Sequence, residues 1–292
     1  MRRLVCAAAF AALVLSSVTA SAFAAGPPQL VAGDPHGLVL ARDARPGSGG
    51  PASNPLLVWH SGQIMTSSAV TAIYWGPSWA STAYQSDKFS GLAVLYSGFG
   101  ASNYMGTNTE YTGTNGQVTS AVAYNGNVID PSSTPRHAPR TSDVLKVVAR
   151  DIANPVPNGY YPVYTDIKRG NAGYCAWHSY GTINGVPVQF GFFFDLNGDP
   201  GCDPGDTSGL HSQGLSALAN VSGHELSEAV TDPRSGGWYD SSGAENADKC
   251  AWTFSGMVTL TNGSQWKIQG NWSNAAYLAN SGYTLGGCIQ GN

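Results

Sequence analysis

Four cysteines in the second half of the chain, Cys175, Cys202, Cys250 and Cys288, restrict the fold more than any other feature of the sequence. An even number of cysteines in an exported chain predicts disulfides, and four cysteines allow three pairings. We favour the pairing of neighbours along the chain, Cys175 with Cys202 and Cys250 with Cys288, which closes loops of 27 and 38 positions. A cysteine-built metal site is disfavoured, because the sequence has no CxxC pair.

The N-terminus predicts export. Arg2 and Arg3 precede an apolar run from Leu4 to about Val18, and Ala22-Phe23-Ala24 has the small-x-small pattern that signal peptidase cleaves. The alternative is an N-terminal membrane anchor, but the run is shorter than the about 20 residues that span a bilayer. We therefore expect a signal peptide at 1–24, which removes Cys6, and a secreted mature protein that is not bound to a membrane.

Composition limits the partners and the domain organisation. Only 11% of residues are charged, the formal net charge is −4, and no basic stripe is present, which argues against nucleic-acid binding. Residues 25–55 are rich in Pro, Gly, Ala and Asp and predict a flexible linker or a short pro-segment, of which we favour the linker. Residues 56–292 then form a single domain, which we expect to act as a monomer.

Hydrophobic patterning predicts an α+β domain with helices packed on a mixed or antiparallel sheet. β-Branched and aromatic runs predict strands, and apolar residues at three- and four-residue spacing predict helices. The expected strands are 56–60, 69–76, 160–165 and 186–194; the expected helices are 84–100, 143–152 with Ser142 as its N-cap, and 209–232; residues 252–269 are expected to form a hairpin.

The helix predicted at 209–232 carries the candidate chemistry. His224 and Glu228 are four positions apart, so they lie on one side of a helix, one turn apart, and can bind one cation together. We expect this side to face away from the core, and Glu225 to project beside the cation. A carboxylate in that place can take a proton from metal-bound water. Pro233 ends the helix directly after Asp232.

Two resemblances extend this interpretation. His224-Glu225-Leu226-Ser227 and Ala229-Val230-Thr231-Asp232 resemble the active-site helix of thermolysin-type metallopeptidases (zincins), except that Glu228 replaces the second histidine. Over Leu57 to Cys288 the chain resembles secreted bacterial proteins related to the phosphate-induced/EXORDIUM family. The segments that carry this second resemblance are 70–75, 173–178, 228–233, 237–240, 245–250 and 269–274.

The zincin resemblance implies a zincin-like fold, one catalytic Zn²⁺ and further site residues. In zincins a downstream glutamate is the third ligand, and a nearby aspartate orients the first histidine. It thus implies that Glu245 is the third ligand and that Asp248 holds His224, while the reverse assignment stays open. His178 is attractive as a catalytic residue that stabilises an oxyanion, by analogy with a transition-state histidine. An ordinary structural role beside Cys175 is the alternative.

A structural Ca²⁺ site is a further candidate, because alternate oxygen-bearing side chains can converge on a hard cation. The residues are Asp195, Asn197, Asp199, Asp203 and Asp206, but Pro200 stands where a calcium loop needs glycine, so a turn is the default interpretation.

We therefore expect a secreted zinc-dependent peptidase that acts on a protein or peptide substrate. The alternative is a non-catalytic extracellular or cell-wall interaction protein of the EXORDIUM type, because plant members of that family largely lack the His-Glu pair.

Overall fold

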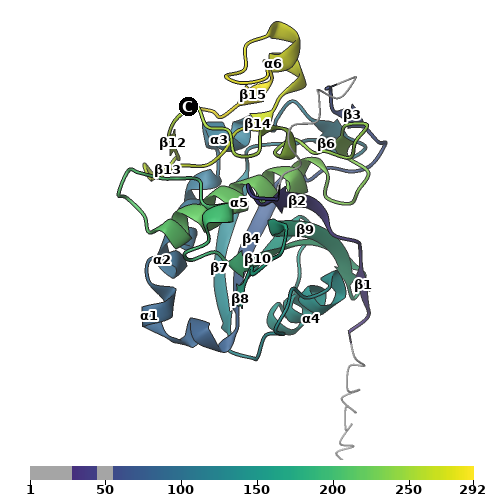
Figure 1. The fold of residues 1–292 in the computed structure, drawn as a ribbon. Helices are drawn as coiled ribbons and strands as arrows, with labels where there is room; N and C mark the ends of the chain where they lie inside the picture. Colours follow the sequence, from purple (N-terminus) through teal and green to yellow (C-terminus); the bar gives the residue numbers. More distant parts are fainter. Residues whose placement is uncertain (1–27, 45–54) are drawn as a thin grey trace, which may run out of the picture.

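The computed structural model describes residues 28–44 and 55–292 (Figure 1). The predicted signal peptide and Cys6 lie outside the described residues. Within the described ranges, no helix is long and apolar enough to cross a bilayer.

A mixed sheet forms the centre of the fold. Its order is β1-β9-β10-β8-β4-β7, with β2 also paired to β9. The strands β7, β4, β8 and β10 are parallel to one another, whereas β9 runs antiparallel to β10. Their bounds are β4 Ser68–Trp75, β7 Val122–Asp130, β8 Gly159–Lys168, β9 Tyr174–Ile183 and β10 Val186–Asp195. The α+β class with a mixed sheet agrees with the sequence prediction, which placed no strand at β9.

The outer edge of β9 is covered by two strands from the N-terminal segment. Strand β1 (Leu30–Ala32) pairs with residues 181–183 and β2 (His36–Leu40) with residues 174–178, both antiparallel. The prediction of a flexible linker over 25–55 is therefore wrong for these residues. The sequence of this segment is rich in Pro and Gly and shows no clear alternation, so it gives little strand signal, and β9 supplies the hydrogen-bonding partner that makes these residues strands. Residues 45–54 lie outside the described part of the chain.

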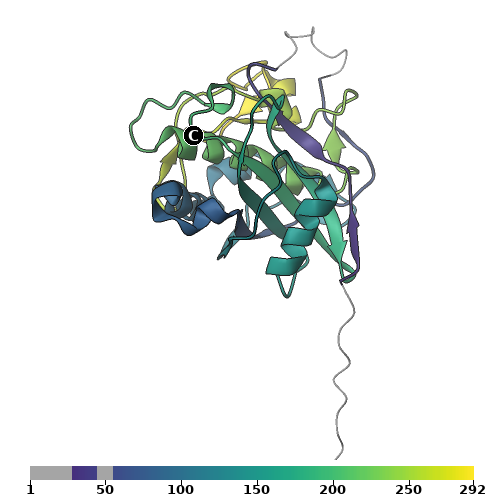
Figure 2. The same ribbon diagram turned by 60° about the horizontal axis from the view of Figure 1, so that its bottom comes forward.

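Helices pack on both faces of the sheet. Residues three positions apart on a strand point to opposite faces, and on β9 Gly181 faces Leu145 of α4 (Thr141–Asp151) whereas His178 contacts Glu225 of α5 (Gln213–Thr231). Figures 1 and 2 show α4 and α5 on opposite sides of the sheet. Helix α2 (Lys88–Phe99) packs beside α5 and against β7.

The helix starts refine the sequence prediction. Ser212 caps α5, because its side chain accepts a hydrogen bond from the backbone N–H of Leu215. Ser142 does not cap α4 as predicted: it lies inside the first turn, and the capping position is Arg140.

Helix α5 is buried on all sides. Every residue from Gly214 to Thr231 is buried, including His224, Glu225 and Glu228, each with 0% exposure. The expectation that the polar side of this helix faces away from the core is therefore wrong. Strand β2 and the loop after α5 lie over that side, so it forms a polar layer inside the protein.

Small elements and two disulfides complete the described chain. The disulfides are Cys175–Cys202 and Cys250–Cys288, which confirms the predicted pairing. Strands β12 and β13 confirm a hairpin within 252–269. The remaining elements are β3 Val58–Trp59, α1 Thr82–Gln85, α3 Asn103–Gly106, β5 Thr112–Gly113, β6 Gly116–Gln117, β11 Trp238–Tyr239, β12 Val258–Thr259, β13 Gln265–Trp266, β14 Asn271–Trp272, α6 Asn274–Ala279 and β15 Cys288–Ile289, with 3₁₀ turns at Pro77–Ala80, Pro200–Cys202 and Asp248–Cys250.

Candidate metal centre

Seven histidine and carboxylate side chains meet between α5, β9, β2 and the loop that follows β11. They form three overlapping groups whose possible ligand atoms lie within 4.8 Å of one another. Four elements supply them: His224, Glu225 and Glu228 come from α5, His178 from β9, His36 from β2, and Glu245 and Asp248 from the loop.

The first group, which we call the α5 triad, consists of His224, Glu228 and Asp248. His224 Nε2 lies 2.9 Å from Glu228 Oε1 and 3.5 Å from Asp248 Oδ1. Two ligands of a tetrahedral zinc ion, each about 2.0–2.1 Å from the metal, are about 3.3 Å apart. The backbone N–H of Asp248 also donates to Glu228 Oε1 at 2.9 Å. The spacing of the triad is therefore that of donors around one cation.

The second group, the β2 triad, consists of His36, His178 and Glu245. Glu245 Oε1 lies 3.1 Å from His36 Nδ1, and its Oε2 lies 3.8 Å from His178 Nε2. The two imidazole rings meet edge to face, with centroids 4.0 Å apart. The third group, His178, Glu225 and Glu228, joins the other two, because His178 Nδ1 lies 3.1 Å from Glu225 Oε2 and 3.7 Å from Glu228 Oε2.

Unsatisfied polar atoms concentrate in this cluster. Buried polar atoms are normally hydrogen-bonded, so each exception requires an explanation. The following buried atoms of the cluster have no hydrogen-bond partner among the described residues: His36 Nε2, His178 Nε2, His224 Nε2, Glu225 Oε1, Glu228 Oε2 and Glu245 Oε2. His224 Nε2 lies close to Glu228 Oε1, as two ligands of a shared cation would. Imidazole and carboxylate are also ligands that zinc accepts.

Neighbouring groups contact one ring nitrogen each of His178 and His224. His178 Nδ1 shares a hydrogen with Glu225 Oε2, 3.1 Å away; in the tautomer that carries this hydrogen on Nδ1, Nε2 has the free lone pair. For His224, the amide of Gln269 is oriented by two backbone groups: its Oε1 accepts from Trp252 N–H, and its Nε2 donates to Ala247 C=O. That amide nitrogen also faces His224 Nδ1 at 2.7 Å, which leaves the hydrogen on Nε2.

Burial dominates the acid–base properties of the centre. Burial lowers the pKa of His178 well below its usual value, and the nearby His36 and His224 add to the shift, so the ring is neutral. Burial raises the pKa of Glu225 and Glu245 well above the usual range and, with Asp248, raises the pKa of Glu228 to about 7. The metal-free centre therefore retains protons that a bound cation would displace.

Burial also lowers the pKa of His224, but the charges of Glu228 and Asp248 outweigh it and the net shift is upward. In either protonation state its Nε2 carries a hydrogen. Zinc binding through this atom therefore has to displace that hydrogen.

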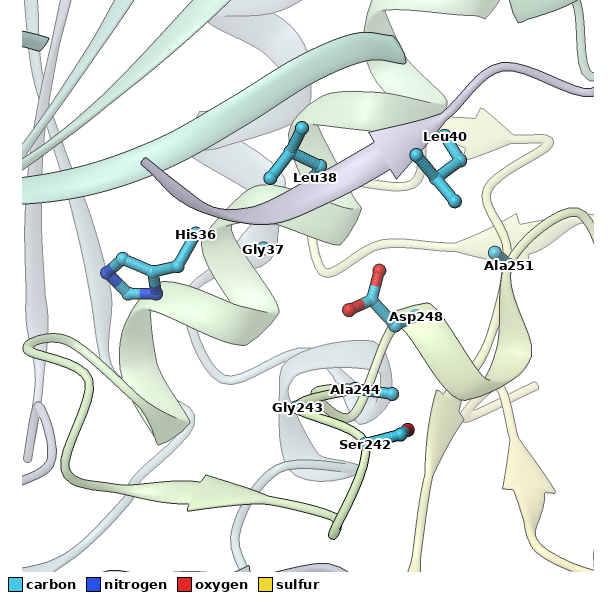
Figure 3. Close-up of a pocket in the computed structure, with 9 residues that line it drawn as sticks. All are labelled: His36, Gly37, Leu38, Leu40, Ser242, Gly243, Ala244, Asp248 and Ala251. Carbon is cyan, nitrogen blue, oxygen red and sulfur yellow. The ribbon is translucent and has the colours of Figure 1, made fainter. Parts of the chain in front are cut away.

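Access to the centre is from one side. A cavity of about 430 Å³ is lined by residues of β2 and of the 242–251 loop. Figure 3 shows the carboxylate of Asp248 extending from the loop toward β2, with His36 at the start of that strand. The side chains of Asp248 and His36 are 24% and 15% exposed, whereas His178, His224, Glu225 and Glu228 are fully buried.

The structure brings together all the residues expected at the site but groups them differently. Asp248, not Glu245, lies with His224 and Glu228, which corresponds to the reverse of the favoured assignment. Glu245 lies with His36 and His178. His178 is not exposed to the cavity, so it contacts the cluster and not the open space where a substrate would bind.

His36 is the site residue that sequence reasoning missed. It falls in the segment assigned to a linker, and its only signal is the short run His36-Gly37-Leu38-Val39-Leu40, in which apolar residues alternate poorly. Its position depends on pairing with β9, which lies about 140 positions later in the chain.

The candidate Ca²⁺ residues are not grouped as possible ligands of one ion in the described part of the chain. Asp195 is held by Lys88 and Lys168, at 3.7 and 2.8 Å, and Asp199 is held by Arg169 at 2.6 Å. No candidate metal group in the described ranges contains any of the five residues proposed for it. Basic side chains thus lie against the carboxylates of Asp195 and Asp199, whereas those of Asp203 and Asp206 accept the backbone N–H groups of Gly205 and Ser208.

Comparison with family models, curated proteins and solved structures gives no match for this chain.

Proposed function

We propose that this protein is a secreted zinc-dependent peptidase. One observation carries the proposal: six unpartnered, buried imidazole and carboxylate atoms converge beside a cavity of about 430 Å³. Such a set of donors is costly to bury without a cation. Export is supported by the two disulfides and by the leader-like N-terminal sequence.

The roles follow from the positions of the side chains. His224, Glu228 and Asp248 would hold the zinc ion, with the hydrogen on His224 Nε2 released on binding. Zinc supplies Lewis-acid activation of water and of the scissile carbonyl. Glu225 would be the general base: its Oε2 lies 3.1 Å from His178 Nδ1, and its Oε1 has no partner among the described residues. It can accept a proton once a bound cation has displaced the proton that burial favours on this carboxyl. The cavity beside Asp248 and His36 would receive the peptide.

The Glu225→Gln variant tests this mechanism. Hydrolysis of casein should fall by about 10²–10⁴-fold, the usual contribution of a positioned general base, while the zinc content stays unchanged. Chelation should also abolish activity, and zinc should restore it. The Asp143→Asn substitution, at a partly exposed position on α4, is the control and should leave activity unchanged. Full activity of zinc-loaded Glu225→Gln would exclude this role.

A non-catalytic extracellular role is the second candidate, and burial is the observation that favours it. Structural zinc sites are closed by protein ligands, whereas catalytic sites keep one position for water, and four of the seven side chains here are fully buried. A protein that binds zinc stoichiometrically but hydrolyses neither casein nor a denatured protein would support this alternative.

A further inference from the structure

The β2 triad has the donors of a metal site of its own. His36, His178 and Glu245 come from three segments far apart in the sequence, and their possible ligand atoms lie within 4.8 Å of one another. Two imidazoles and one carboxylate form a common set of protein ligands for catalytic zinc. None of the three belongs to the α5 triad.

His178 is already oriented as a ligand. Histidines that bind metals usually donate their other ring N–H to a carboxylate or carbonyl, which fixes the ring and its lone pair. Here His178 Nδ1 lies 3.1 Å from Glu225 Oε2, a carboxylate placed to accept this N–H, and the fully buried Nε2 has no partner in the described chain and faces Glu245. His224, in contrast, has its hydrogen directed to Nε2 by Gln269.

The other two members are compatible with the same cation. His36 Nδ1 shares a hydrogen with Glu245 Oε1, and a cation can take the place of that hydrogen. No described residue accepts from or donates to His36 Nε2, so no other hydrogen bond fixes the ring. Glu245 Oε2 is buried and unpartnered. An ionised carboxylate buried so deeply is strongly destabilising without a counter-charge.

The backbone of β2 at Gly37 lies so close to the triad that there is no space for a side chain. A Cβ on Gly37 would lie 2.3 Å from Glu228 Oε2 and from His178 Cε1. Strand β2 therefore approaches as closely as glycine permits, and this approach places His36 opposite His178, its partner in the β2–β9 pairing.

We propose that His36, His178 and Glu245 bind a second divalent cation, zinc or a transition metal of similar chemistry, beside the one assigned to the α5 triad. The bound ion fastens β2 to β9 and to the 240–248 loop. Three protein ligands leave one coordination position of the ion free. His36 lines the cavity, so this position can face the cavity. This inference does not depend on peptidase activity.

Metal stoichiometry tests the proposal. The purified full-length mature chain is stripped with a chelator, reloaded with Zn²⁺, and analysed for zinc per chain after removal of free metal. We expect two zinc ions in the unaltered protein, one in His36→Ala and one in His224→Ala. His137→Ala is the control, because His137 is an exposed histidine outside the cluster and should leave two.

The outcomes separate this proposal from the proposed function. One ion that is lost in His224→Ala and kept in His36→Ala would overturn the second site and leave the α5 triad intact. One ion lost in His36→Ala and kept in His224→Ala would support the β2 triad and contradict the zinc ligands proposed for catalysis. No zinc in the unaltered protein would overturn both.

A second variant and a second measurement protect the test against misfolding. Glu245→Gln keeps the side-chain volume and should lose the same ion as His36→Ala, with an unchanged circular dichroism spectrum. Zinc should also slow proteolysis within residues 28–44 in the unaltered protein but not in Glu245→Gln. Equal protection in both proteins would show that no ion fastens β2 through this triad.

Discussion

At the scale of single residues, Gly37 determines whether β2 can cover the metal centre. Its φ of 55° lies in the left-handed region, and a Cβ at this position would meet Glu228 and His178. Both features favour glycine, since any other L-residue adds a Cβ and strain. Gly37 therefore provides the backbone conformation that places its neighbour His36, a candidate ligand, beside His178.

The first prediction is that Gly37→Ala destabilises the protein more than a glycine substitution in an open turn. Gly185 also has positive φ, 82°, but a Cβ there meets nothing within 4 Å. Gly185→Ala should therefore cost only the backbone term of about 1–2 kcal/mol, whereas overpacking should add about 1–3 kcal/mol for Gly37→Ala. Urea unfolding measures both, and equal losses would show that β2 tolerates a Cβ at the centre.

At the scale of elements, the chemistry depends on α5 and on the loop that carries two further site residues. The first turn of α5 is capped by Ser212, whose hydroxyl also donates to Asp87 Oδ1 at 2.6 Å. At its C-terminal end, the loop that carries Glu245 and Asp248 is held by the Cys250–Cys288 disulfide. The helix thus carries three of the seven side chains, and the loop carries two.

The second prediction concerns this cap. Ser212→Ala removes the acceptor for Leu215 N–H and should lower the free energy of unfolding by about 1 kcal/mol, within a range of about 0.5–2. Ser142→Ala is the matched control within α4 and should change stability by less than about 0.5 kcal/mol, since Ser142 is not a cap. Chemical denaturation of the two variants compares them directly, and similar losses would contradict the capping role of Ser212.

At the scale of the whole molecule, the cluster couples folding to protons and metal. Glu225, Glu228, Glu245 and His224 have pKa values raised by folding, whereas folding lowers the pKa of His36 and His178. Because the pKa values of His36 and His178 are lowered, the free energy of unfolding rises as the pH rises toward 6.5. Above pH 6.5 these two histidines have no further effect on stability. The groups with raised pKa values bind more protons in the folded state than in the unfolded state. Above pH 6.5 they therefore make the free energy of unfolding fall as the pH rises.

The third prediction follows from these signs. Between pH 6.5 and 8 the metal-free protein should lose stability, with about 1 kcal/mol from Glu228 alone if its pKa is about 7. Saturating zinc should reverse the slope, because cation binding needs deprotonated ligands and stabilises the folded state. Thermal unfolding in chelator and in zinc at both pH values measures this. Glu228→Gln should flatten the metal-free slope, and a rising slope in chelator would contradict the protonation states described.

Local patterns along the sequence were sufficient for much of this protein. Helical spacing identified α2, α4 and α5, and apolar runs identified β4, β8 and β10, because hydrophobic periodicity is recorded in consecutive residues. Neighbouring cysteines predicted both disulfides. The spacing of His224, Glu225 and Glu228 located the site on the chain, because one helical turn brings such residues together without help from distant segments.

Only the tertiary structure decided how these parts meet. The role of His36 depends on β2 pairing with β9, and the division of Glu245 and Asp248 between two triads depends on how the 240–248 loop folds over α5. The burial of the polar side of α5 likewise results from β2, which the composition of 25–55 assigned to a linker. Contacts between residues more than a hundred positions apart leave no periodic trace in the sequence, since their free energy arises only when the chain has folded.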